Sequence, residues 1–153
     1  MGTRNIQTFR VNGVSERLIQ QFVRLDKKGD GRPWNTEGWR SESRRLDTRM
    51  ILAFVDNELV GLALYRMDPF VESLHLFKII VNYHQRCKGI GKAMMRTFLE
   101  YASVLNVYNV ILDVEKTNLA AIGLYKSFDF KVLVDRPSYY SNGHASFLME
   151  LKL

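Results

Sequence analysis

The sequence predicts an α/β fold in a single domain over residues 1–153, with a mixed and mostly antiparallel sheet. At the glycine-containing segment 86–92, the hydrophobic pattern changes from the strand type of residues 74–81 to a helical repeat over residues 90–105. A turn-forming pair between two apolar runs further predicts an antiparallel hairpin. The 46% hydrophobic composition of 153 residues suffices for one sizeable core, and no repeat indicates a second domain.

The N-terminal half is predicted to contain three strands and two helices. A strand over residues 5–11 precedes a helix that begins near Ser15, with apolar residues at helical spacing. After a glycine-rich polar loop, a short helix is expected to run from Asn35, a good N-cap, toward Arg45. Residues 50–55 and 59–65 flank Asp56-Asn57 and form the hairpin.

The C-terminal half is predicted to alternate strands and helices before two closing strands. The expected elements are a strand over 71–81, the helix after segment 86–92, a strand near 108–114, a helix started by Asn118, and strands near 130–134 and 145–151.

The segment Arg86-Cys87-Lys88-Gly89-Ile90-Gly91-Lys92 is the strongest candidate for ligand binding. A helix start offers unpaired N–H groups and the positive end of the helix dipole, and glycine lets a pyrophosphate approach closely. A nucleotide P-loop is excluded, because Arg86 and Ala93 stand where it needs Gly and Ser or Thr. A Rossmann fingerprint fits poorly, because Met94 replaces its third glycine. An ordinary strand–loop–helix connection remains the alternative.

Arg86-x-x-Gly89-x-Gly91 resembles the pyrophosphate-binding signature, Arg/Gln-x-x-Gly-x-Gly/Ala, of the GNAT superfamily of N-acetyltransferases. Residues 110–130 resemble that family's strand, asparagine-started helix and Leu-Tyr-x-x-x-Gly-Phe ending, with Asp129 at the usual glycine. Aspartate tolerates the left-handed conformation, so the fold should survive this change. The resemblance covers nearly the whole chain and implies a seven-stranded sheet flanked by about four helices.

From about residue 30 onward the chain is most similar to the RimI-type protein N-terminal acetyltransferases. The matching segments are Pro33-Trp34-Asn35 with Trp39, residues 76–81, Leu112-Asp113-Val114, Tyr139-Tyr140 with a glycine-containing turn, and Phe147-Leu148-Met149.

This resemblance implies an acetyl-CoA-dependent enzyme and assigns roles to residues. Acetyl-CoA is expected to contact Ile79, Ile80, Val81, Arg86, Cys87, Lys88, Gly89, Ile90, Gly91, Lys92, Asn118 and Tyr125. In RimI-type enzymes a strand glutamate is the base and the Leu-Tyr tyrosine the acid, which correspond here to Asp113 and Tyr125. Asp113 is one methylene shorter than glutamate, which favours a water relay. Trp34 and Trp39 are expected to wall a peptide site opposite Tyr139 and Tyr140.

Each of these roles has a plainer alternative. Asp113 is equally consistent with a solvent-facing carboxylate at a strand end, Tyr125 with a core aromatic, and Asn118 with a simple cap. Asn118, Ile122 and Tyr125 nevertheless share one helix face, which can line a cofactor. Cys87 lacks an assigned base, so covalent catalysis is not expected.

The expected acceptor is the N-terminal α-amine of a protein. Its pKa of about 7.7–8.0 lies below the value of about 10.4 for lysine, so a weak base such as a carboxylate can deprotonate it more easily. A small amine such as a polyamine or an antibiotic is the alternative within the same fold. From another class, a basic ribosome- or RNA-binding protein or a non-catalytic acyl-CoA-binding protein is possible. The net charge of +6 does not distinguish these classes of protein, but the basic residues form no recognised RNA motif.

Other features of the composition give expectations of location and ligands. His75, His84 and His144 show no ligand spacing, so no metal is expected. The single cysteine, the lack of a long apolar run and the lack of a secretory start predict a cytoplasmic protein without membrane contact, either a monomer or a homodimer.

Overall fold

The computed structural model describes residues 4–10, 13–29, 32–137 and 144–153 of the chain. It confirms the predicted α/β class with one seven-stranded sheet of order β1-β2-β3-β4-β5-β7-β6. The strands are β1 (Arg4–Arg10), β2 (Thr48–Val55), β3 (Glu58–Asp68), β4 (Ser73–Val81), β5 (Asn109–Glu115), β6 (Lys131–Arg136) and β7 (Ser146–Lys152). Among these described strands, only β4 and β5 pair in parallel, whereas the other neighbours are antiparallel.

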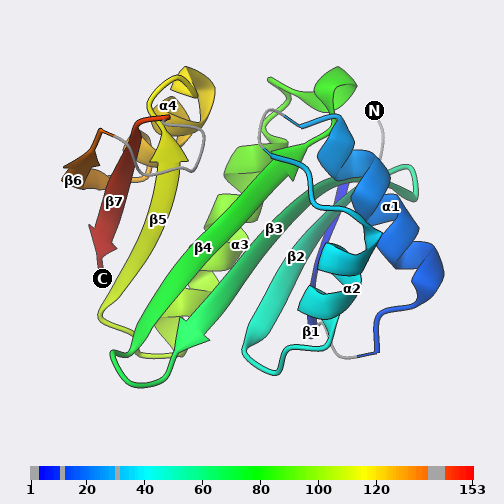
Figure 1. The fold of residues 1–153 in the computed structure, drawn as a ribbon, viewed down its shortest axis with the longest axis horizontal. Coiled ribbons are helices and arrows are strands. Elements are labelled where there is room, and N and C mark those ends of the chain that lie inside the picture. The colour runs from blue at the N-terminus through cyan, green and yellow to red at the C-terminus, as the bar shows by residue number, and fades with distance from the viewer. Residues whose placement is uncertain (1–3, 11–12, 30–31, 138–143) are drawn as a thin grey trace.

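In the described residues, four α-helices cover the two faces of this sheet (Figure 1). They are α1 (Glu16–Lys27), α2 (Thr36–Ser43), α3 (Ile90–Val104) and α4 (Leu119–Lys126), and one short 3-10 turn, Tyr83–Gln85, follows β4. The three predicted helix starts are confirmed, since Ser15, Asn35 and Asn118 each accept a backbone N–H in the first turn of a helix. None of the helices in the described residues is long and apolar enough to cross a membrane.

Each face of the sheet contributes to its own hydrophobic cluster. Helices α3 and α4 pack on one face, where Met94, Phe98 and Leu112 are almost completely buried. Helices α1 and α2 pack on the other face, around Phe22 and Trp39. Because residues 59–65 of β3 lie under helices on both sides, they are all buried, which explains their nearly continuous apolar sequence.

Strands β4 and β5 diverge after a short paired stretch (Figure 1). Their pairing joins residues 73–76 to residues 109–112, whereas β4 continues to Val81 and β5 to Glu115. A bulge contributes to this divergence: Leu76 and Lys78 oppose successive residues of β3, so that Phe77 is the extra residue. The divergence leaves backbone groups of both strand ends facing an opening in the sheet.

Candidate active site

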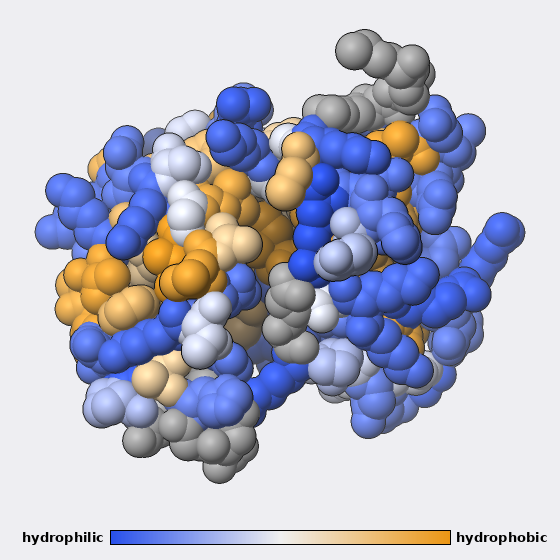
Figure 2. Space-filling view, turned by 90° about the horizontal axis from the view of Figure 1, so that it is seen from above, coloured by the Kyte–Doolittle hydropathy of each residue, from blue (hydrophilic) through white to orange (hydrophobic). Residues whose placement is uncertain are grey.

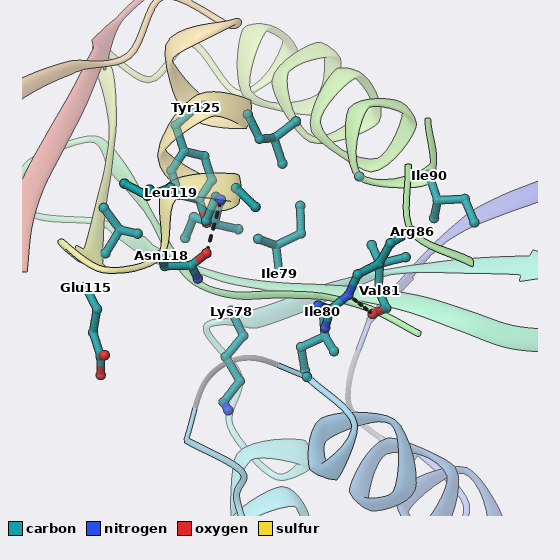
Figure 3. Close-up of a pocket in the computed structure, with 18 of the residues that line it drawn as sticks. Lys78, Ile79, Ile80, Val81, Arg86, Ile90, Glu115, Asn118, Leu119 and Tyr125 are labelled. Carbon is teal, nitrogen blue, oxygen red and sulfur yellow. Dashed lines mark hydrogen bonds between the residues drawn. The ribbon is translucent and has the colours of Figure 1, made fainter. Parts of the chain in front are cut away.

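A cavity of about 1120 Å³ occupies the opening between β4 and β5. Figure 2 looks onto this end of the molecule and shows a hollow with hydrophobic walls beside a hydrophilic rim. In Figure 3, Asn118 and Tyr125 belong to one wall, and Ile79, Ile80 and Val81 of β4 belong to the facing wall. The structure thus brings together, around one cavity, sequence-predicted residues that are far apart in the chain. They are Trp34, Ile79, Ile80, Val81, Arg86, Cys87, Gly89, Ile90, Gly91, Lys92, Asp113, Asn118 and Tyr125, but not Lys88 or Trp39.

The predicted phosphate segment begins helix α3 at one end of this cavity. Gly89 is the N-cap residue, with a left-handed φ of 79° and no side chain to cap the helix. The first N–H groups of α3 therefore have no side-chain acceptor from the N-cap residue and are available to an anion. Arg86 is held beside them, because its Nε donates to the Val81 carbonyl at 3.3 Å (Figure 3). Its Nη2 also donates to the Lys28 carbonyl at 3.3 Å.

Asp113 lies on β5, on the sheet face opposite the buried side chains of Leu112 and Val114. Its carboxylate is only 14% exposed; Arg136 Nη1 donates to its Oδ1 at 2.9 Å, and His75 Nε2 lies 3.4 Å from its Oδ2. Asp113 is therefore a paired, largely buried carboxylate rather than a solvent-facing one.

His75 does not line the cavity but contacts Asp113 from the neighbouring strand, a link that the sequence pattern did not predict. The histidines were considered only as metal ligands, whereas the parallel register places His75 opposite Ile111, two residues before Asp113. The imidazole also stacks on Phe77, with ring centroids 4.0 Å apart. Because side chains alternate along a strand, His75 and Asp113 lie on the same face of the sheet. The sequence alone could indicate this contact only if β4 and β5 were already known to be neighbours.

Tyr125 is both a core aromatic residue and a residue of the cavity wall, the two interpretations that its sequence pattern left open. The side chain is 5% exposed and packs against Phe130, with ring centroids 5.9 Å apart, so it belongs to the core. It also lines the cavity, from the helix that Asn118 caps. Asn118 caps α4 by accepting the N–H of Ala121 at 3.1 Å and lines the same wall.

The two tryptophans occupy different environments, which corrects one expectation. Trp34 is half-buried and lines the cavity, but Trp39 is completely buried and cannot form its wall. Trp39 lies in the first turn of α2 and points into the core, where it packs on Trp34 and on Phe22 at centroid distances of 4.9 and 5.3 Å. Trp39 therefore supports Trp34 from behind. Tyr139 and Tyr140 lie outside the described residues.

The carboxylates of the cavity wall are balanced by cations. Among the described residues, the acidic side chains that line it are Asp26, Asp113 and Glu115. Asp26 pairs with Lys78 at 3.0 Å, Asp113 pairs with Arg136, and Glu115 lies 3.8 Å from Arg32 and 3.3 Å from His144. In the same part of the chain, no group of three or more His, Cys, Asp or Glu side chains is arranged to hold a metal ion.

Comparisons with known proteins agree with this architecture. The model of the acetyltransferase (GNAT) family matches residues 16–130. An N-alpha-acetyltransferase of Sulfurisphaera tokodaii is 29% identical over an aligned length of 156 residues, and the alignment covers 95% of this chain and 93% of that protein.

Two solved structures share the fold at low sequence identity. The ribosomal-protein-S18-alanine N-acetyltransferase of Escherichia coli superposes with a TM-score of 0.85 at 19% identity, covering 98% of this chain and 94% of that one. A chain of the NatC complex bound to Gag peptide and CoA gives a TM-score of 0.80 at 19% identity, covering 97% of this chain and 99% of that one. With the family match over most of its length, the chain is an acyltransferase that belongs to the acetyltransferase (GNAT) family.

Proposed function

We propose that the protein transfers the acetyl group of acetyl-CoA to the N-terminal α-amine of a protein. The observation that carries this proposal is the cavity between β4 and β5, which joins the uncapped start of α3 to a largely buried carboxylate and a buried phenol. Its relative from Sulfurisphaera tokodaii, named N-alpha-acetyltransferase, supports the choice of acceptor.

The donor would bind along the edge of β4 that faces the opening. The pyrophosphate would accept N–H groups at the start of α3, where the helix dipole and the nearby charges of Arg86 and Lys92 favour an anion. The amide groups of the extended arm could pair with the backbone of residues 79–81, as an added strand pairs with a sheet edge. This geometry would direct the thioester toward Asp113 and Tyr125.

Acetyl transfer requires a neutral amine, a donor for the oxyanion and a proton for the departing thiolate. The amine nitrogen attacks the thioester carbonyl carbon and loses a proton to Asp113 through a water molecule. His75, which contacts the same carboxylate, extends this proton-accepting group. When the C–S bond breaks, the Tyr125 hydroxyl gives its proton to the thiolate, since a phenol is protonated at neutral pH.

The charges around the cavity favour a protein α-amine over a polyamine. A polyamine is a polycation, and a site for it needs carboxylates that are not already neutralised. Here Asp26, Asp113 and Glu115 are each paired with a cation, and the half-buried Trp34 offers an apolar wall suited to a peptide. A cytoplasmic location and a monomeric or dimeric state remain predictions.

Two variants test the proton-accepting role directly. Asp113→Asn keeps the shape of the side chain but removes its basicity, so acetylation of a peptide should fall about a hundredfold or more. His75→Gln should produce a smaller loss, because it leaves the Asp113 carboxylate in place. Single-turnover rates at saturating acetyl-CoA measure both changes, and an Asp113→Asn enzyme as fast as wild type would exclude Asp113 as the base.

A further inference from the structure

A buried ion pair outside the proposed chemistry lines the cavity beside Trp34 and joins α1, α2 and β4. Asp26, in the last turn of α1, is 2% exposed. Its Oδ2 accepts the backbone N–H of Trp34 at 2.8 Å and the indole N–H of Trp39 at 3.1 Å. Lys78 Nζ, from β4, donates to both carboxylate oxygens at 3.0 Å. One carboxylate thus connects α1, the segment before α2, α2 itself and β4.

Lys78 has no donor left for a substrate. Besides its two bonds to Asp26, its ammonium donates to the Arg32 carbonyl at 2.7 Å, and its side chain is only 11% exposed. Burial lowers the pKa of Lys78, and the Asp26 carboxylate opposes this effect by favouring the charged form. Lys78 therefore connects structural elements and does not take part in the reaction.

The contacts of this pair converge on Trp34. The ammonium of Lys78 lies 4.7 Å from the centre of the Trp34 ring, Trp39 packs on that ring, and Asp26 holds its backbone N–H. Trp34 itself lies just before the Asn35 cap of α2, outside any helix or strand, so regular backbone hydrogen bonds do not fix it. Its orientation then depends on the ion pair and on Trp39.

We propose that Asp26 and Lys78 are positioning residues for the acceptor, because their ion pair holds the Trp34 indole in place on the acceptor wall. This inference rests on the proposed function for its kinetic consequence, although the positioning of Trp34 can be measured without an acceptor. Since the pair is electrically balanced, it positions the indole without adding net charge to the wall.

Lys78→Met tests this inference, because methionine keeps most of the side-chain length and removes the ammonium. We expect kcat/KM for a peptide acceptor to fall about tenfold to a hundredfold, mainly through KM, as for a misplaced binding group. The Kd of acetyl-CoA should stay within about twofold. The chain has two tryptophans, both in this cluster, so their fluorescence emission should also shift to longer wavelength when Trp34 is released.

Two further variants separate positioning from a loss of folding. Lys152→Met makes the same change at an exposed position at the end of β7 and should leave the kinetics and the fluorescence unchanged. The double variant Asp26→Asn, Lys78→Met replaces the ion pair by neutral groups of similar size, which often preserves stability. It should stay folded and still show the raised KM.

The inference is overturned if folded Lys78→Met and the folded double variant keep the wild-type emission spectrum or the wild-type KM for the peptide. An equal loss of acetyl-CoA affinity would also overturn it, because the effect would then not be specific to the acceptor. If the wild-type protein acetylates no peptide, the proposed function fails instead, and the emission spectra alone decide whether the ion pair holds Trp34.

Discussion

Replacing Tyr125 by phenylalanine separates its place in the core from its proposed place in the reaction. The substitution removes one oxygen atom and no carbon, so the packing against Phe130 and Ile122 is retained. Losing one hydrogen-bonding hydroxyl from a side chain that is 5% exposed should change the free energy of unfolding by no more than about 1.5 kcal/mol. Loss of a general acid should slow acetyl transfer about 10²–10⁴-fold, a barrier increase of about 2.7–5.4 kcal/mol.

Rapid-quench measurement of one turnover at saturating acetyl-CoA gives the rate of the chemical step, and calorimetry gives the Kd of the donor. We expect a large fall in the single-turnover rate and little change in Kd. Tyr65→Phe is the matched control, because Tyr65 is also a buried tyrosine and does not line the cavity. Equal single-turnover rates for Tyr125→Phe and wild type would refute the argument and leave Tyr125 as a packing residue only.

Three further predictions follow from the stability and the ligand site. Tyr65→Phe should stabilise the protein by about 1 kcal/mol in urea unfolding, because the buried Tyr65 hydroxyl has no hydrogen-bond partner among the described residues; a loss of stability would indicate a hidden partner. Acetyl-CoA at about one hundred times its Kd should raise Tm by roughly 5–10 °C. This shift should be lost in Gly91→Trp, because Gly91 lines the cavity and an indole there would occupy the space proposed for the pyrophosphate; an equal shift in the folded variant would contradict the site. Hydrogen bonds from Arg40 and Arg45 lower the pKa values of the Glu16 and Asp47 carboxyls, respectively. Each ion pair therefore stabilises the folded protein at pH values above the pKa that its carboxyl has in the unfolded chain, and this stabilisation is lost as the pH falls through the lower, folded pKa. Glu16→Gln with Asp47→Asn should therefore flatten the fall of Tm below about pH 4.5, and an unchanged slope would show that these pairs do not contribute.

Much of the fold could be predicted because local residues determine it. Ser15, Asn35 and Asn118 start helices through their own side chains, and Asp56 and Asn57 adopt the positive φ of 49° and 64° that their hairpin turn requires. Asp129 also takes the expected left-handed conformation, with φ of 67°. The start of β4 was predicted two residues early, because Glu72, with φ of 48°, still belongs to the preceding turn.

The predictions that depended on tertiary contacts were less complete. Trp39 matched a family pattern and was expected on the peptide wall, but only the packing of α2 on Phe22 shows that it points into the core. His75 could not be connected to Asp113 without the register of two strands whose ends diverge. The Asp26–Lys78 pair joins residues 52 positions apart, a separation that carries no local signal in the sequence.

A competition between acceptors tests the central claim most directly. One reaction would contain acetyl-CoA and equal concentrations of three acceptors: a lysine-free peptide with a free α-amine, the same peptide with a blocked N-terminus and one internal lysine, and spermidine. Mass spectrometry of the early products gives the ratio of their kcat/KM values. Our account predicts acetyl almost entirely on the α-amine, because this amine loses its proton about 2.5 pH units below lysine and the wall carboxylates are already paired. Preferential acetylation of spermidine or of the internal lysine, across peptides with varied N-terminal residues, would contradict the proposed acceptor and leave only the family assignment.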